Sequence, residues 1–153
     1  MFADPTTRAA TFAAVFAALY VAHQVADHWV QTQHQADTKG HPGWAGRAAC
    51  AAHVATYTLT AVVALGLLAA GTGLRFDLFH VAVGLLISAV SHYVADRRTP
   101  LRKLAELSRS ARFYALGTPR TGRDDNPSLG TGAYALDQSF HLFFLFAAAL
   151  FIA

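Results

Sequence analysis

Residues 76–96 read FDLFHVAVGLLISAVSHYVAD, an apolar stretch of membrane-spanning length that ends in a histidine and an aspartate. His92 and Asp96 are four positions apart, so on a helix they lie on one face, about 6 Å from each other. The same pattern closes an earlier apolar stretch, where residues 22–27 read AHQVAD and contain His23 and Asp27. Ionisable side chains at membrane depth are costly, and they therefore mark candidate functional sites.

The composition is typical of an integral membrane protein. The 153-residue chain is 54% hydrophobic and 14% charged, against about 25% charged residues in ordinary soluble domains. Four apolar segments approach the roughly 20 residues that a spanning helix needs, at about residues 9–27, 48–70, 76–95 and 133–153. We predict an all-α integral membrane four-helix bundle, with residues 1–153 forming a single transmembrane domain. A soluble helical protein is the weaker alternative, because the loops are too few to solvate four such helices.

Positive charge is concentrated on one side of the predicted spans. Arg8 and Arg75 lie on the poorer side. The other Lys and Arg residues lie in the first and third connections: Lys39, Arg47, Arg97, Arg98, Arg102, Lys103, Arg109, Arg112, Arg120 and Arg123. Because short loops rich in Lys and Arg stay in the cytoplasm, we expect a multi-pass protein of a bacterial inner membrane with both termini outside. Each His-x3-Asp pair then falls in one hairpin, which predicts two tandem helical hairpins.

The third connection carries a helix signal of its own. Thr99 and Pro100 form a helix start, and small and apolar residues follow at helical spacing. We predict a basic interfacial helix over about residues 100–116 that lies on anionic lipid headgroups, with a plain solvated helix as the alternative. The Gly-rich segment 117–132 is a connector or a lid.

This topology brings ionisable side chains from all four spans to one depth. The second span begins near His53, and the fourth begins near the reversed pair Asp137 and His141. The predicted metal ligands are His23, Asp27, His53, His92, Asp96, Asp137 and His141. So many buried carboxylates need neutralisation. Imidazole with carboxylate suits Zn first, and Mn or Fe as alternatives, with one or two ions per chain.

Other interpretations of these residues stay open at this point. His and Asp can simply hydrogen-bond between membrane helices. Two facing His could also bind haem iron, although haem needs no Asp beside each His. We expect Cys50 to be a small core residue, and Tyr57 to hydrogen-bond His53 or merely to pack. Gln31 and Gln138 are polar caps or groups that orient the ligands.

The spaced polar residues also resemble a known family. They are His23-x3-Asp27-x3-Gln31-Thr32, His53, His92-x3-Asp96 and Leu136-Asp137-Gln138-x2-His141. This set resembles an uncharacterised family of small bacterial integral membrane proteins, a domain of unknown function that sometimes carries the label transcriptional regulator. The resemblance implies four transmembrane helices and supplies no activity. A looser, fold-level similarity is to bacterial inner-membrane metal-dependent hydrolases.

The function that these observations favour is metal-dependent hydrolysis of an anionic phosphate or acyl ester, lipid esters included, at the cytoplasmic face. Asp96 or Asp137 would act as general base beside the metal. Arg97, Arg98 and Arg102 would attract the substrate or a lipid headgroup.

The main alternative is a non-enzymatic, metal-stabilised scaffold or sensor that binds a partner through the basic helix. Transport is disfavoured, because the outer halves of the spans, such as residues 62–68 and 81–87, offer no continuing polar path. We expect no nucleic-acid partner, since no recognition helix is evident. A homo-oligomer is compatible with either function.

Overall fold

The computed structural model describes residues 4–118, 122 and 130–153. These residues form helices and no strands: α1 (Pro5–Val25), the π-helical turn η1 (Ala26–Val30), α2 (Gln33–Thr38), α3 (Gly43–Thr72), α4 (Leu78–Asp96), α5 (Thr99–Leu107), α6 (Ala111–Tyr114) and α7 (Thr131–Ile152). Four helices are long and apolar enough to cross a membrane, namely α1 continued by η1, α3, α4 and α7. The all-α prediction and the four membrane-length helices are confirmed. The largest shift at a helix start is in α3, which begins at Gly43 rather than near residue 48.

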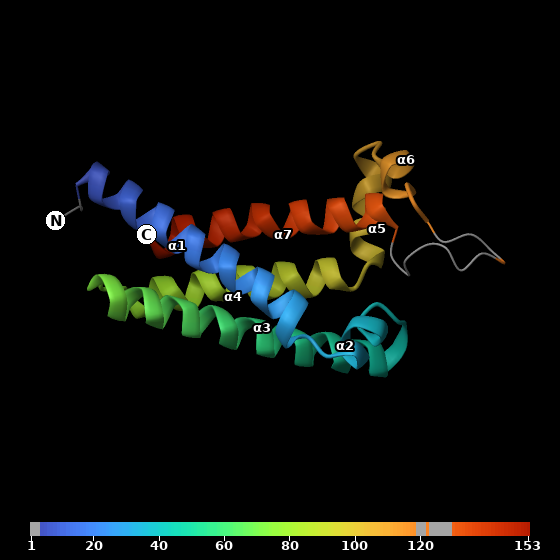
Figure 1. Ribbon diagram of the computed structural model, residues 1–153. Helices are drawn as coiled ribbons and strands as arrows, with labels where there is room; N and C mark the ends of the chain where they lie inside the picture. The colour runs from blue at the N-terminus through green and yellow to red at the C-terminus, as the bar shows by residue number, and fades with distance from the viewer. Residues whose placement is uncertain (1–3, 119–121, 123–129) are drawn as a thin grey trace.

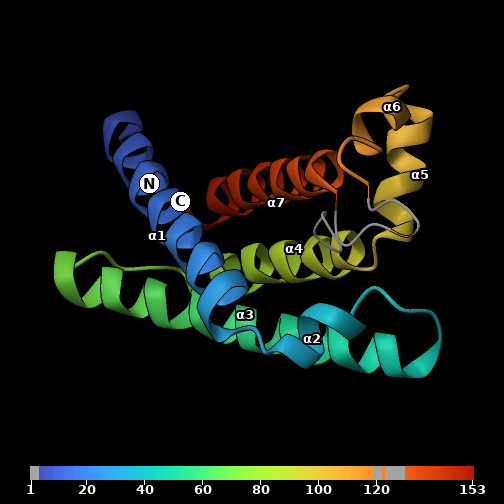
Figure 2. The same ribbon diagram turned by 45° about the vertical axis from the view of Figure 1, so that its right-hand side comes forward.

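The long helices run between two distinct ends of the molecule. Helices α4 and α7 lie side by side, while α1 crosses the group and packs on α3 and α7 (Figures 1 and 2). Both termini lie at one end, and the short helices α2, α5 and α6 gather at the other (Figure 1). We call the second the polar end, because the ionisable residues discussed below lie there.

A glycine allows α4 and α7 to approach closely. A Cβ atom placed on Gly84 would lie 2.5 Å from Cγ1 of Ile152 and 2.9 Å from the carbonyl oxygen of Ala148. Small residues at such crossings let two membrane helices make backbone contact, which is the main source of their packing energy in lipid.

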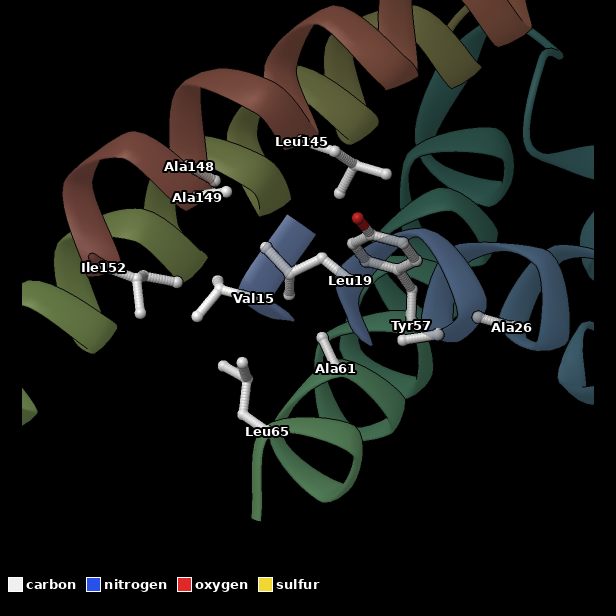
Figure 3. Close-up of a cluster of buried hydrophobic side chains, with 11 residues drawn as sticks. Val15, Leu19, Ala26, Tyr57, Ala61, Leu65, Leu145, Ala148, Ala149 and Ile152 are labelled. Atoms are coloured by element: carbon white, nitrogen blue, oxygen red, sulfur yellow. The ribbon is translucent and has the colours of Figure 1, made fainter. Parts of the chain in front are cut away.

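The apolar core occupies the half of the bundle nearer the termini. Side chains of α1, α3 and α7 meet there, among them Val15, Leu19, Leu65 and Leu145 (Figure 3). Large apolar side chains also cover the outer surface, as at Leu59, Leu67, Leu86, Phe143 and Phe151. An apolar surface around an apolar core is the distribution expected of helices that face lipid.

The connection between α3 and α4 is short and well capped. Gly73 ends α3 with a left-handed backbone (φ 74°), and Asp77 caps α4 by accepting hydrogen bonds from the N–H groups of Phe79 (2.9 Å) and His80 (3.1 Å). Bonds from the backbone and side chain of His80 hold the pKa of the Asp77 carboxyl below its ordinary value. This connection lies at the same end as the termini.

The third connection differs from the single helix predicted over residues 100–116. Two short helices, α5 and α6, replace it, and Arg109 between them has a left-handed backbone (φ 61°). The N–H of Ser110 donates to the carbonyl of Ala105 (2.7 Å), which ends α5 in a tight turn. The basic side chains of Arg102 and Lys103 are exposed, and Leu101 is buried. Most of the predicted connector or lid, with Arg120 and Arg123, lies outside the described residues.

Candidate metal centre

All seven predicted ligands converge inside the polar end. His23 comes from α1, Asp27 from η1 and His53 from α3. His92 and Asp96 come from α4, and Asp137 and His141 from α7. The four histidines and Asp96 are buried, whereas the side chains of Asp27 and Asp137 keep 9% and 17% exposure.

Four of these side chains bring together two histidine nitrogens and, near both of them, two carboxylate oxygens. The Nε2 atoms of His53 and His92 are 3.0 Å apart. Oδ1 of Asp27 lies 3.3 Å from the first of these nitrogens and 3.5 Å from the second. Oδ2 of Asp96 lies 3.4 Å and 3.2 Å from the same two nitrogens. We call Asp27, His53, His92 and Asp96 the quartet.

The five distances that involve the two histidine nitrogens match those between ligands of a small divalent ion. Ligand bonds of about 2.0–2.1 Å at the tetrahedral angle place neighbouring ligand atoms about 3.3–3.4 Å apart. The five quartet distances run from 3.0 to 3.5 Å. Two imidazole nitrogens and two carboxylate oxygens are also the donor set that Zn, Mn and Fe accept.

The quartet oxygens lack hydrogen bonds in the described part of the chain. Oδ1 of Asp27 and Oδ2 of Asp96 are both buried without a hydrogen-bond donor. An unsatisfied buried polar group costs about 1–3 kcal/mol, and more when it is charged. A cation at the centre of the quartet would satisfy both oxygens at once.

The remaining three predicted ligands lie beside the quartet. Nδ1 of His23 is 3.6 Å from Oδ2 of Asp27, and Nε2 of His23 is hydrogen-bonded to Oε1 of Gln138 at 3.2 Å. The His141 ring lies beside that of His23, with 5.1 Å between centroids, and its Nε2 lies 3.5 Å from Oδ2 of Asp137 and 4.0 Å from Oδ1 of Asp96. Three groups of three residues could each hold an ion: His53 with His92 and Asp96, His23 with Asp27 and His92, and Asp96 with Asp137 and His141.

Lys39 is a site residue that the sequence analysis missed. It follows α2 directly, and its Nζ lies 2.8 Å from Oδ1 of Asp96, with only 12% of the side chain exposed. When the Gln31 amide oxygen faces Lys39, it accepts a hydrogen bond from Nζ at 2.7 Å. With neutral histidines, three carboxylates and one ammonium leave two negative charges, which one divalent cation would balance.

Arg97 and Arg98, which follow α4, bind the backbone of the first connection, between η1 and α3. The Arg97 guanidinium donates to the backbone carbonyls of Lys39 and His41, and Arg98 donates to the carbonyl of Ala36 at 3.2 Å. These bonds hold the end of α2 against the end of α4, which is what brings the Lys39 ammonium to Asp96. Arg102 is exposed and lies 3.8 Å from Glu106.

Aromatic and polar side chains close the site toward the core. The Tyr57 ring stacks on His92 with 4.0 Å between ring centroids, and His92 stacks on His141 at 4.1 Å. The Tyr57 hydroxyl and Oγ of Ser88 are hydrogen-bonded at 2.6 Å. Tyr57 therefore packs beside the ligands, and its hydroxyl is bonded to Ser88 rather than to His53. The sequence pattern did not point to Ser88. Cys50 is fully buried, and its thiol donates to the Tyr93 carbonyl.

A polar cavity reaches the site from the polar end. Its volume is about 250 Å³, and its lining includes Asp27, Lys39, Asp96, Arg98, Tyr114 and Asp137. Arg97 and Arg102, predicted with Arg98 to attract the substrate, do not line it. Burial raises the pKa of the Tyr114 hydroxyl, which therefore stays a hydrogen-bond donor at neutral pH.

The fold and the site define a class: a helical protein with four helices of membrane-spanning length and a buried His/Asp cluster at one end of them. Within that class, the chain belongs to the family described as "Protein of unknown function (DUF3307)", whose model matches residues 15–153. The predicted membership of an uncharacterised family covering nearly the whole chain is confirmed. No curated protein and no solved structure matches the chain.

Proposed function

We propose that this protein is a metal-dependent hydrolase of a bacterial inner membrane that cleaves an anionic phosphate or acyl ester at the cytoplasmic face. The observation that carries the proposal is the quartet, whose four donor atoms are spaced as ligands of one ion. A polar cavity leads to it from the end that carries the basic residues.

One divalent ion, with zinc preferred, would be held by Asp27, His53, His92 and Asp96. When bound, such an ion supplies Lewis acidity, and it activates water at neutral pH if a position opens for that water, either as a fifth ligand or in place of one quartet carboxylate. Lys39 neutralises part of the Asp96 charge. His23 and His141 flank the quartet and orient its carboxylates, as the outer partners of metal ligands commonly do.

Asp137 is better placed than Asp96 to act as general base. Asp96 belongs to the quartet and also pairs with Lys39, whereas Asp137 lies outside the quartet and lines the cavity. Asp137 would take a proton from the attacking water as the new O–P or O–C bond forms. The ester bond then breaks, and the proton passes to the leaving oxygen, giving an acid and an alcohol.

The membrane arrangement is part of the proposal. Two tandem hairpins would cross the bilayer with the polar end in the cytoplasm and both termini outside, because the basic residues gather at that end. Helices α5 and α6 would lie at the interface, where Arg102, Lys103, Arg109 and Arg112 meet anionic headgroups.

Elemental analysis of detergent-purified protein tests the metal. We expect one divalent ion per chain, lost in His92→Ala and Asp96→Ala and kept in His80→Ala, which changes an exposed histidine near the termini. A screen of phosphate and acyl esters then tests the reaction. Asp137→Asn should keep the ion and lose hydrolysis, while Asp77→Asn should keep both. A folded, monodisperse protein without metal, or full activity in Asp137→Asn, would refute the proposal.

A second candidate is a non-enzymatic scaffold, favoured by the fact that the quartet joins η1, α3 and α4. An ion bound there would cross-link three helices and stabilise the bundle. This candidate predicts that chelation unfolds the protein or abolishes binding of a partner to the basic helices, with no ester hydrolysed in the screen.

A further inference from the structure

Two apolar grooves lie on the outer side of α7, next to the polar cavity. The first, of about 180 Å³, lies between α5 and α7, and its lining includes Leu101, Leu104, Leu136, Phe140 and Phe143. The second, of about 420 Å³, lies between α4 and α7, and its lining includes Leu86, Ile87, Val90, Val94, Phe140 and Phe144. Apart from a few serines, both walls are apolar and aromatic.

The three hollows are neighbours that share lining residues. Leu101 lines both the polar cavity and the first groove. Phe140 lines both the first and the second groove. Leu101 is 7% exposed, so it forms a wall between the cavity and the first groove. A molecule that straddles Leu101 would place a polar head beside Asp137 and an apolar tail along α7.

The depth of the grooves matches one leaflet of a bilayer. Leu86 precedes Asp96 by ten residues on α4, so it lies about 15 Å deeper along the helix axis. The hydrocarbon core of a bilayer is about 30 Å thick, so 15 Å is the depth that the acyl chains of one leaflet occupy. The second groove lies between two helices of membrane-spanning length, α4 and α7, and α7 also forms one side of the first groove, so their outer sides would face lipid.

The two faces of α5 suit an interfacial lipid. Leu101 and Leu104 point to the first groove, whereas Arg102 and Lys103 are exposed. Arg98, the N-cap residue of α5, lines the polar cavity itself. The cavity lining also contains four Asp residues, so an anionic headgroup would meet positive charge at Arg98 and at the exposed Arg102 and Lys103, and its chain would meet apolar side chains.

We propose that the protein binds an anionic phospholipid of the polar-end leaflet, with the ester in the polar cavity and one acyl chain in the grooves along α7. This inference rests on the proposed function, whose substrate class it narrows from anionic esters to membrane lipids.

Photolabelling of the wild-type protein tests the lipid site without relying on catalysis. The probe is phosphatidic acid with a diazirine in one acyl chain, incorporated at low mole fraction into nanodiscs that hold the purified protein. We expect adducts on the segments of α4 and α7 that line the grooves, mapped by mass spectrometry. Adducts spread evenly over all lipid-facing helices would overturn the proposal.

A matched pair of substitutions tests the point that the two grooves share. Phe140→Trp puts a larger side chain where the grooves meet, and Leu59→Trp puts the same side chain on an exposed position of α3. Labelling of the grooves should fall about two- to tenfold in Phe140→Trp, the range expected for a displaced aromatic contact. It should stay at the wild-type level in Leu59→Trp. Equal labelling in the two variants, with both folded and monodisperse, would also overturn the proposal.

Ester hydrolysis separates failure of the lipid site from failure of the proposed function. Phe140→Trp should slow cleavage of a long-chain ester more than that of its short-chain analogue, and Leu59→Trp should slow neither. Adducts confined to the grooves without hydrolysis of any ester would refute the hydrolase and leave the lipid site standing. Hydrolysis with adducts elsewhere would refute the lipid site and leave the hydrolase standing.

Discussion

The Nε2 atoms of His53 and His92 lie 3.0 Å apart, although the two histidines belong to different helices. Each nitrogen also lies within 3.5 Å of one oxygen of Asp27 and one of Asp96. Without a cation, two imidazoles must share protons with each other and with two carboxylates. A cation between the four atoms removes that competition, because all four then act as electron-pair donors. Substitutions at this pair therefore report most directly on whether an ion is held.

Zinc affinity should fall more when a quartet residue is replaced than when a flanking residue is replaced. His53→Ala removes a ligand and should weaken zinc binding by more than about 100-fold, whereas His23→Ala removes only a partner of Asp27 and should cost about 10–100-fold. Competition with a chromophoric chelator measures both constants, with His80→Ala as the unaffected control. Equal constants in His53→Ala and His23→Ala would contradict the division between ligand and flanking residue.

Lys39→Met should destabilise the metal-free protein by about 3–5 kcal/mol, because it leaves the buried carboxylate of Asp96 without its partner. Zinc at saturation should reduce the loss, since the ion takes over part of the neutralisation. Thermal unfolding in detergent, with and without zinc, measures both effects. The control is Lys103→Met on exposed α5, expected within about 0.5 kcal/mol of the wild type. Equal unfolding temperatures of the two lysine variants would show that the ion pair with Asp96 does not stabilise the fold.

Gly84→Ala should destabilise the packing of α4 on α7 by about 1–3 kcal/mol, because its Cβ would meet Ile152 and the Ala148 carbonyl. Gly66→Ala in α3 is the matched control. A Cβ there meets nothing within 4 Å, so the substitution should stabilise the helix by up to about 1 kcal/mol. Opposite signs of the two shifts in unfolding temperature are expected. A stabilising Gly84→Ala would mean that the two helices are farther apart than described.

Tyr57→Phe should cost about 1–3 kcal/mol, because it leaves the buried Ser88 hydroxyl without its partner. Adding Ser88→Ala should recover much of that loss, since the double variant leaves no unpaired hydroxyl at this place. A double-mutant cycle on unfolding temperature measures the coupling. Additive effects would show that the hydroxyl pair contributes nothing beyond the packing of the ring.

The part of the architecture that hydropathy encodes could be predicted from the sequence. Long apolar runs identify the four membrane-length helices, because a bilayer requires helices of that length. The i, i+4 spacing also places each histidine beside its aspartate, as the 3.2 Å between His92 and Asp96 illustrates. Positions within one helix follow from helix geometry alone.

Contacts that depend on irregular backbone could not be predicted in the same way. Asp27 lies in the π-helical turn η1, and such turns carry no strong local sequence signal. Lys39 reaches Asp96 because Arg97 and Arg98 bind backbone carbonyls of the first connection, an arrangement that periodicity does not encode. One signal was available: Thr32 and Gln35 form a capping box, which marks the start of α2.

The position of the cluster at one end of the helices has a consequence for biogenesis. If the polar end stays on the side where the chain is synthesised, no member of the quartet has to be translocated across the apolar layer. Of the connections between the long helices, only the short segment 73–77, with Arg75 and Asp77, must then cross, together with the two chain ends that the proposed topology places outside. Joining of the helices at the quartet would come afterwards, at the membrane surface where cytosolic ions are available. Assembly of the bundle could therefore wait for metal supply without halting insertion.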